Sequence, residues 1–515
     1  MPSLSQTPAA RRVQIAPDPT FRFALIGIGV VTLIRLMWLA GHPIDLYPDE
    51  AQYWIWAQHL DWGYYSKPPF VAWMIAATTA LFGDNDLAIK IGASFTYIGT
   101  SLLVFAIAAR LYSRRIAAWS AIAFVTLPAV SLSSVIISTD VPLLFFWALA
   151  TYAFVRAREA DRWGWWVLAG IACGLGLLSK YAMGYWLLSA LGFLALIRDE
   201  RRHLKYFLGA AVLAALVYLP NFLWNWSHGF VSYAETGRDA NVHGAALHPQ
   251  AFLEFLGSQF GVFGPIFFAT LIWIAATGRR VLADRRALML ASFALPTLAF
   301  MLVVAMLSRA NANWSAPTYL TATILVVAFL SERGSEALVQ WSVVLHIVLA
   351  IVGFGAHGVA ERFGWHLPGR LDPLHRVIGW QRLGQSLSEI RARNEPLPLL
   401  GDERELMADL IYYMQPHPFD MKIWNPGQHI RNGFEMTQSL PDRPGGDYLW
   451  ITNRSNRDEM YARFAGFEQV AHVVVPLGPG LPPREAWIYV MSGFKGYADR
   501  TAPAAAAMTP EVKAE

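Results

Sequence analysis

The chain has 515 residues, of which 55% are hydrophobic and 15% charged, with a net charge of +4 and a mean hydropathy of +0.35. Soluble domains carry about 25% charged residues, so this composition favours a protein embedded in lipid. The basic residues punctuate apolar segments instead of forming one cluster, which argues against a nucleic-acid partner. The single cysteine, Cys173, excludes a disulfide framework and a cysteine-based metal site.

Apolar segments long enough to cross the hydrocarbon core of a bilayer recur along most of the chain. The first follows a polar tail, residues 1–20, which we expect in the cytoplasm. The predicted spans are 21–41, 88–112, 115–136, 139–156, 163–179, 181–197, 205–221, 257–277, 287–307, 315–331 and 338–355. The sequence therefore predicts a polytopic α-helical membrane protein of about 11 spans plus interfacial helices, with a transmembrane domain over residues 21–355.

The loops between these spans fall into two sets, one rich in Lys and Arg and one poor in them. The basic set contains Arg11, Arg12, Arg22, Arg110, Arg114, Arg115, Arg156, Arg158, Arg162, Arg198, Arg201, Arg202, Lys205, Arg279, Arg280, Arg285, Arg286 and Arg333. Short basic loops stay in the cytoplasm, so the other set faces the periplasm. The two sets alternate only if 70–83 does not cross, and this short segment suits a re-entrant or interfacial helix. The first periplasmic loop is then 42–87.

Residues 356–499 contain no predicted span and show alternating helical and strand-like patterns. Helices are expected over 372–394 and 403–414, and strands over 396–401, 421–425, 447–453, 469–477 and 486–493. This order is typical of a small α/β domain, which an odd number of spans places in the periplasm. It contains no glycine-rich phosphate motif, so no nucleotide is assigned. Residues 500–515 are expected to be a disordered tail.

The first periplasmic loop carries the most informative motif, HPIDLYPDEAQYWIWAQHLDWGYYSKPP. Asp49 and Glu50 are predicted to open a helix, where the helix dipole favours ionised acids. A carboxylate there could act as a general base on an acceptor hydroxyl, and the alternative is ordinary helix capping. Tyr53 and Tyr65 belong to the surrounding aromatic residues and are candidates for lining a substrate cavity.

Cations and a further acid occur at the predicted outer ends of other spans. Lys67, before two prolines, is positioned to pair with a carrier phosphate, and the alternative is a snorkelling lysine or a lipid contact. Asp140 opens the fourth span, and Lys180 lies between the fifth and sixth. Ionisable groups this close to hydrocarbon are usually functional or paired, so we expect either a site or a structural ion pair.

Two further outer loops supply candidates. The 222–256 loop carries Arg238 and His243, which could close over a head group or simply be solvated. The loop before the tenth span brings Arg309, Trp314 and Tyr319 to the outer mouth, where Arg309 could hold a phosphate.

Taken in order, DEAQYW, GYYSKPP, TDVPL, GLLSKY and NANWSAPTYL resemble the bacterial branch of the protein mannosyltransferase superfamily. That branch includes the aminoarabinose transferases of lipid A modification and the rhizobial galacturonosyltransferases of lipopolysaccharide, all C-type (GT-C) glycosyltransferases. The resemblance covers about residues 20–330. It implies that Asp49, with Glu50 beside it and Asp140, provides the catalytic carboxylates, and that Lys67 and Lys180 hold the carrier phosphate.

The resemblance also implies a polyprenyl-phosphate sugar donor, a lipid A, lipopolysaccharide-core or other envelope acceptor, and an inverting transfer at the periplasmic face of the inner membrane. Some aminoarabinose transferases carry an acid associated with a metal where this chain has Ser66, so we expect neither a metal nor another cofactor. The alternatives are a lipid or sugar transporter, a ligase for whole oligosaccharides and a non-catalytic assembly protein. The sequence leaves the sugar and the acceptor open.

Overall fold

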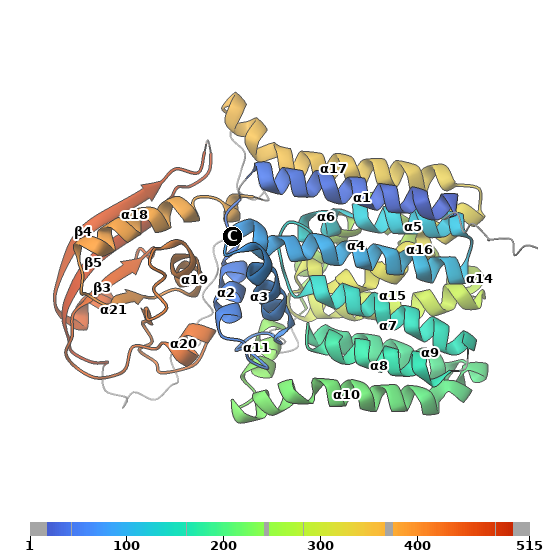
Figure 1. The fold of residues 1–515 in the computed structure, drawn as a ribbon, viewed down its shortest axis with the longest axis horizontal. Helices are drawn as coiled ribbons and strands as arrows, with labels where there is room; N and C mark the ends of the chain where they lie inside the picture. The colour runs from blue at the N-terminus through green and yellow to red at the C-terminus, as the bar shows by residue number, and fades with distance from the viewer. Residues whose placement is uncertain are drawn as a thin grey trace, which may run out of the picture.

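The computed structural model describes residues 18–497 except 43, 161, 241–246, 282, 366–373 and 479. Figure 1 shows two parts, a bundle of helices that lie side by side and a smaller domain, built around a sheet, at one end of the bundle. The predicted fold class, a polytopic helical protein with a small C-terminal α/β domain, is confirmed. The predicted tail residues 500–515 and most of 1–20 lie outside the described residues.

The bundle contains most of the helices. Their bounds are α1 (Pro19–Gly41), α4 (Asp86–Leu111), α5 (Arg114–Thr126), α6 (Pro128–Ser133), α7 (Asp140–Ala160), α8 (Trp163–Leu177), η1 (Tyr181–Met183), α9 (Gly184–Leu196), η2 (Arg198–His203), α10 (Leu204–Ser227), α12 (Pro249–Phe263), α13 (Pro265–Ala276), α14 (Gly278–Val281), α15 (Arg285–Leu307), η3 (Ala312–Ser315), α16 (Ala316–Glu332) and α17 (Glu336–Phe363). All eleven predicted spans are helical over most of their length.

Fewer helices are long and apolar enough to cross a membrane than the eleven spans that the sequence predicts. Within the described residues, 7 helices are long and apolar enough to cross a membrane, or 8 if the bent pair α12 and α13 counts as one span. The predicted span 115–136 divides at Pro128, which cannot continue α5. The segments at α8 and α9 are only 15 and 13 residues long, and a helix of that length covers about 20 Å.

The bend between α12 and α13 is 119° and depends on one glycine. Gly264 joins the two helices with φ 88°, a conformation that residues with a Cβ atom rarely adopt. A Cβ atom there would also lie 2.1 Å from Nε2 of His346 on α17. The close approach of α17 and the sharp bend therefore both require glycine.

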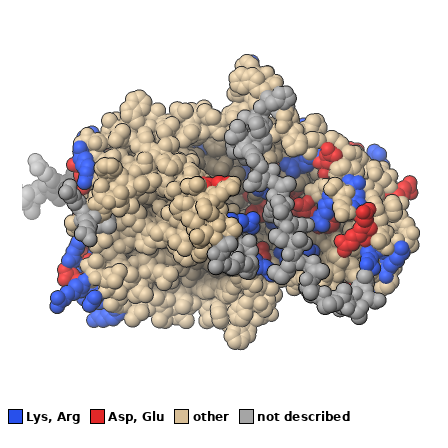
Figure 2. Space-filling view, turned by 180° about the vertical axis from the view of Figure 1, so that it is seen from behind, with Lys and Arg blue, Asp and Glu red and all other residues tan. Residues whose placement is uncertain are grey.

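The basic connections gather at the end of the bundle remote from the C-terminal domain. On the face in Figure 2, Lys and Arg crowd this end, and a broad band of uncharged residues separates them from the junction with that domain. Ion pairs join the helix ends into one layer: Arg114 with Asp18, Arg110 with Glu159, Arg115 with Glu336 and Arg286 with Glu332. The predicted grouping of the basic loops on one side is confirmed.

Three helices lie at the opposite end of the bundle, next to the C-terminal domain: α2 (Pro48–Gln58), α3 (Phe70–Phe82) and α11 (Val231–Ala240) (Figure 1). The 13 residues of α3 are too few for a span. Helix α3 lies within residues 70–83, the segment that the sequence predicts not to cross the membrane.

The C-terminal domain has a five-stranded sheet of order β2-β1-β3-β5-β4. Strand β1 is parallel to β2 and β3, whereas β5 is antiparallel to β3 and β4. The elements are η5 (His375–Val377), α18 (Trp380–Arg393), β1 (Leu399–Gly401), α19 (Arg404–Tyr413), β2 (Lys422–Ile423), α20 (Gly433–Thr437), β3 (Tyr448–Thr452), α21 (Asp458–Ala462), β4 (Phe464–Val475) and β5 (Arg484–Phe494). One buried apolar cluster continues from the bundle through α2 into α18 and α19, so the two parts share a core.

Candidate functional site

The first acid pair occupies the start of α2, as the sequence predicts, but its two carboxylates have opposite surroundings. Glu50 is fully buried, and its two oxygens accept the backbone N–H groups of Tyr47 at 2.9 Å and Ile137 at 2.7 Å. Burial raises the pKa of Glu50, and Lys90, 3.7 Å away, opposes that shift. Glu50 thus caps the start of α2 and holds it against the segment before α7. This is the capping role that the sequence leaves open as the alternative to catalysis.

Asp49 remains accessible, with 41% of its side chain exposed. Its Oδ1 accepts a hydrogen bond of 2.9 Å from Nη1 of Arg404, on α19 of the C-terminal domain. The same Nη1 donates to Oε1 of Gln52 at 2.6 Å. Within the described residues, Oδ2 of Asp49 accepts no hydrogen bond, so it can accept a proton from a bound molecule.

A second polar cluster forms where α7 begins. Oδ1 of Asp140 accepts a hydrogen bond of 2.7 Å from Nζ of Lys180, and Oδ2 accepts one of 2.9 Å from Nδ2 of Asn313. The ammonium of Lys180 is therefore engaged by Asp140, as the ion-pair alternative expects. This arrangement joins the ends of three bundle segments that are far apart in the sequence.

Asp140 and Asn313 lie on the wall of a cavity of about 500 Å³. The rest of the wall is mainly apolar and comes from α4, the junction of α5 and α6, α7, α12, α16 and α17, including Phe124, Leu144, Val262, Leu349 and Phe354. Tyr319 also lines the cavity; its hydroxyl donates to Oε1 of Gln259 at 2.6 Å. A mainly apolar cavity with an acid and an amide on its wall suits an amphiphilic ligand.

Tyr53 connects the two clusters electrostatically. It is buried on α2, and burial raises its pKa well above the usual value. The charges of Asp49 and Asp140 add to this rise, and Arg404 opposes it. The charges of both acids thus disfavour ionisation of the Tyr53 hydroxyl.

Lys67 lies in a turn that reaches the same region. The turn is closed by the N–H of Tyr64, which donates to the carbonyl of Lys67 at 3.1 Å, and the N–H of Phe70 donates to the carbonyl of Leu178 at 3.0 Å. The second bond brings this turn next to the segment that carries Lys180. Within the described residues, Nζ of Lys67 forms no ion pair or hydrogen bond, so it is available to an anion.

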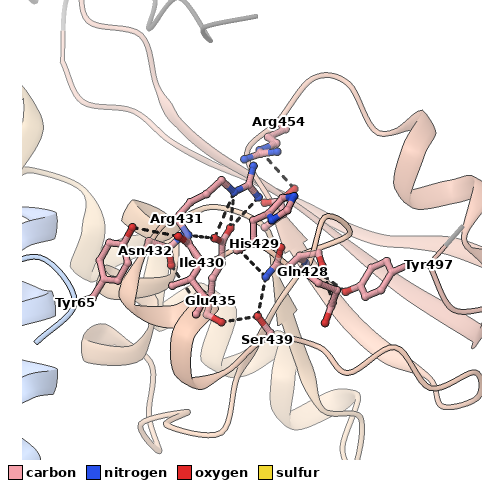
Figure 3. A network of polar contacts seen from close by, with 12 residues as sticks. Tyr65, Gln428, His429, Ile430, Arg431, Asn432, Glu435, Ser439, Arg454 and Tyr497 are labelled. Carbon is pink, nitrogen blue, oxygen red and sulfur yellow. Dashed lines mark hydrogen bonds and ion pairs between the residues drawn. The ribbon is translucent and has the colours of Figure 1, made fainter. Parts of the chain in front are cut away.

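Tyr65 takes part in a separate polar network that joins the bundle to the C-terminal domain (Figure 3). Its hydroxyl donates to Glu235 at 3.0 Å and accepts from Arg238, both on α11, and it approaches the carbonyl of Ile430 at 3.4 Å. In the adjoining loop, Arg431 pairs with Glu435 at 2.8 Å. Tyr65 and Arg238 thus hold elements together in this structure.

Of the candidate residues that the structure describes, Asp140 and Tyr319 line the cavity and the others do not. Trp314 packs against the small apolar cluster of Phe255, Met301 and Ala305. Arg309 is exposed and lies outside the lining of the cavity, and His243 falls outside the described residues. No group of three His, Cys, Asp or Glu side chains positioned to hold a metal occurs within the part of the chain that the structure describes. The expectation of no metal stays a prediction.

Sequence reasoning missed Arg404, although one signal was present. Arg404 is the first residue of α19, where the positive end of the helix dipole disfavours a cation. A basic residue there needs an acidic partner. The identity of that partner depends on tertiary structure, since Asp49 lies 355 positions away.

The described residues thus place two acids, an unpaired lysine and a mainly apolar cavity at the end of a multi-pass bundle that adjoins the C-terminal domain. Residues 66–224 match the family model of dolichyl-phosphate-mannose-protein mannosyltransferases. The chain is 31% identical over 427 residues to the lipid A galacturonosyltransferase RgtD of Rhizobium johnstonii, covering 82% of this chain and 89% of that protein. It is 26% identical over 372 residues to an undecaprenyl phosphate-alpha-4-amino-4-deoxy-L-arabinose arabinosyl transferase of Pseudomonas fluorescens, covering 65% of this chain and 62% of that protein.

The fold has a counterpart among solved structures. The crystal structure of ArnT from Cupriavidus metallidurans in the apo state matches with a TM-score of 0.61 at 16% identity, covering 92% of this chain and 98% of that one. The chain belongs to the family of C-type (GT-C) glycosyltransferases that contains these relatives. It is a multi-pass membrane glycosyltransferase, and the transporter alternative is not favoured.

Proposed function

We propose that this enzyme transfers one sugar from a polyprenyl-phosphate carrier to lipid A or a related envelope acceptor, with inversion, at the periplasmic face of the bacterial inner membrane. The observation that carries this proposal is the arrangement at one end of the bundle. There, Asp140, paired with Lys180, lines a mainly apolar cavity. The turn that carries Lys67, which is unpaired within the described residues, adjoins the segment of Lys180. Asp49, with one unoccupied oxygen, lies at the start of α2 at the same end of the bundle. The 31% identity to a lipid A galacturonosyltransferase supports the choice of acceptor.

Asp49 acts as the general base. Its Oδ2 takes the proton from the acceptor hydroxyl as the hydroxyl oxygen attacks the anomeric carbon of the donor sugar. The bond between that carbon and the phosphate oxygen breaks, its electrons go to the phosphate, and the carrier leaves as polyprenyl phosphate. Because attack and departure occur on opposite faces, the anomeric configuration inverts.

The cations act on the leaving phosphate. Lys67 is free of protein partners within the described residues, so its ammonium can stabilise the negative charge that develops there. Arg309, exposed near the outer end of α15, is a second candidate for this contact. Lys180 holds Asp140, and the pair fixes the cavity wall against which the sugar lies. Tyr319 extends this wall, whereas Tyr53 is buried on α2 outside the lining of the cavity.

The sidedness follows from the charge distribution. The Lys- and Arg-rich end of the bundle faces the cytoplasm, so the end that carries Asp49, Lys67 and the C-terminal domain faces the periplasm. The lipid tails of the carrier and of lipid A then remain in the bilayer, and their head groups meet at the cavity.

The proposal is tested by deleting the gene and comparing the lipid A and lipopolysaccharide of the mutant and the wild type by mass spectrometry. We expect one sugar, tested first as galacturonic acid because of the relative, to be missing from the mutant and restored by the wild-type gene. The Asp49→Asn gene should not restore it. An unchanged envelope in the deletion strain would refute the transferase proposal.

A further inference from the structure

The C-terminal domain places a charged group directly at the proposed active site. Arg404 is the first residue of α19, and its Nη1 lies 2.9 Å from Oδ1 of Asp49 and 2.6 Å from Oε1 of Gln52. Its side chain is 29% exposed, so it borders the accessible region around Asp49. No other described residue donates a hydrogen bond to Asp49.

Helix α19 is held firmly against the first periplasmic loop. At its far end, the hydroxyls of Tyr412 and Tyr413 donate to the two carboxylate oxygens of Asp86 at 2.7 and 3.0 Å. The hydroxyl of Tyr413 also accepts the N–H of Leu46 at 2.6 Å. The ring of Tyr412 packs edge-on against Trp54 of α2, with the ring centroids 4.8 Å apart.

The near end of α19 is fixed as well. Glu405 pairs with Arg376 at 3.3 Å, and the guanidinium of Arg376 lies 4.6 Å from the centre of the Tyr47 ring, just before α2. Helices α2 and α19 therefore form one rigid unit, in which the position of Arg404 relative to Asp49 is set at both ends.

The position of Arg404 is by itself unfavourable for a positive charge. It lies at the positive end of the α19 dipole, and its burial acts to lower its pKa, but Asp49 and Glu405 raise the pKa above its usual value. Such a placement is stabilised by the carboxylate of Asp49.

We propose that Arg404 is a positioning residue for Asp49, so that the C-terminal domain completes the active site of the bundle. This inference rests on the proposed function of Asp49 as the general base. Arg404 fixes Oδ1, which leaves Oδ2 directed toward the acceptor. Without Arg404, the carboxylate turns about its side-chain bonds and is correctly placed for only a fraction of the time.

The test uses the purified full-length enzyme, a polyprenyl-phosphate sugar donor and a lipid A acceptor. In Arg404→Ala we expect kcat to fall about 10- to 100-fold, the range typical of a misplaced catalytic group. The KM values for both substrates should change less than about twofold, because Arg404 does not bind either substrate. Arg404→Lys should retain part of the activity, since an ammonium supplies charge without the planar guanidinium.

Chemical rescue distinguishes positioning from a merely structural role. Millimolar guanidinium should restore activity to Arg404→Ala by occupying the space left by the side chain, and should not restore Asp49→Asn. The double variant should be as inactive as Asp49→Asn alone, with or without guanidinium, because Arg404 acts only through Asp49. The matched control is Arg393→Ala, on α18 of the same domain, whose side chain is 76% exposed; its kcat should equal that of the wild type.

Unchanged or increased kcat in Arg404→Ala would overturn the inference, as would a loss of activity that follows a lower melting temperature and does not respond to guanidinium. These results leave the proposed function intact as long as the wild type transfers sugar and Asp49→Asn does not. If the wild type itself fails to transfer sugar, the proposed function fails first.

Discussion

At the residue scale, Asp49 and Glu50 show how neighbouring carboxylates come to differ. They are adjacent in the sequence, but a helix turns by about 100° per residue, so their side chains point in different directions. Glu50 points into the protein and accepts two backbone N–H groups, whereas Asp49 points to the accessible side and meets Arg404. Glu50 is therefore engaged in holding α2, whereas Asp49 keeps one oxygen accessible for the proposed transfer.

The first prediction compares these two acids. Glu50→Gln replaces one accepting oxygen with an NH₂ group that must face a backbone N–H, which leaves a buried donor unpaired and should cost about 1–3 kcal/mol. We expect Glu50→Gln to lower the melting temperature in detergent. Asp49→Asn should remain folded, with a smaller fall in melting temperature from its weakened bond to Arg404, and should transfer no sugar. Normal stability of Glu50→Gln, or transfer by Asp49→Asn, would contradict the assignment.

The second prediction concerns Lys67. Removing its ammonium in Lys67→Ala takes away a charge that stabilises the leaving phosphate, so transfer should be abolished while the protein remains inserted and folded. The measurement is transfer of sugar by membranes that contain equal amounts of each variant. Lys495→Ala, at an exposed lysine of the C-terminal domain, serves as the control. Full activity of Lys67→Ala would remove this residue from the site.

The sequence could indicate the chemistry of these residues but not their partners. Proline followed by two acids predicts the start of a helix, and this start is confirmed at Pro48. Which acid remains accessible depends on where the segment before α7 and the C-terminal domain come to lie. The contact of Glu50 with Ile137 spans 87 positions of the sequence, and that of Asp49 with Arg404 spans 355. No local sequence pattern encodes contacts over such separations.

At the element scale, the bend between α12 and α13 shapes one side of the cavity. It orients α12 so that Gln259 accepts hydrogen bonds from Ser315 and Tyr319, both at 2.6 Å. The third prediction is that Gly264→Ala destabilises the protein by more than about 1 kcal/mol, because its positive φ and its approach to His346 leave no place for a Cβ atom.

Gly257→Ala gives a matched control for that prediction, since Gly257 lies within α12 and a Cβ atom there would meet nothing within 4 Å. Alanine favours a helix more than glycine does, so this variant should be neutral or slightly stabilising. Both variants are compared by thermal unfolding in detergent. Equal melting temperatures would show that the bend tolerates a side chain.

The connection from β1 to α19 carries a group that titrates near neutrality, the basis of the fourth prediction. Burial raises the pKa of Asp402 from 3.8 to about 6, and the charge of Arg454 and the hydroxyl of Thr452 oppose the shift. Because the pKa is higher in the folded state, the stabilisation is fully present below about pH 4 and is lost as the pH rises through about 6. The loss is about 2–3 kcal/mol.

Asp402→Asn cannot titrate, while its amide oxygen can still accept the hydrogen bond of the Thr452 hydroxyl. The melting temperature of the C-terminal domain in this variant should therefore change less between about pH 5 and pH 7.5 than in the wild type. The full chain in detergent is used for both. An identical pH dependence in the two proteins would contradict the raised pKa.

Most elements could be predicted from the sequence, but their continuity and pairing could not. The positions and lengths of the apolar runs located the main helices of the bundle. The strand-like stretches at 447–453 and 486–493 contain β3 and most of β5. Apolar length does not show that Pro128 divides a span or that α12 and α13 meet at 119°. The order of the strands depends on contacts between distant segments, which periodicity does not specify.

At the scale of the whole molecule, charge and chemistry occupy opposite ends of the bundle. The arginines of one end form ion pairs among the helix termini. At the other end, Asp140 pairs with Lys180 and lines the cavity, and Asp49 pairs with Arg404 of the C-terminal domain. On the face in Figure 2, the band between the two ends carries no charged residues over most of its width, as a bilayer requires. Sidedness thus sets where the sugar is transferred.

The fifth prediction tests this sidedness directly. Single cysteines are introduced at Arg201, exposed at the basic end, and at Arg393, exposed on α18, in a chain that carries Cys173→Ser. Cys173 is buried, so its replacement by a small residue should leave the fold intact. A maleimide that cannot cross the inner membrane should label the 393 variant in cells with a permeable outer membrane and leave the 201 variant unlabelled. Both variants should react after lysis, which controls for accessibility.

Labelling of the 201 variant before lysis would place the basic end in the periplasm, and with it the proposed site in the cytoplasm. Lipid A exported to the outer face of the inner membrane could then not reach Asp49.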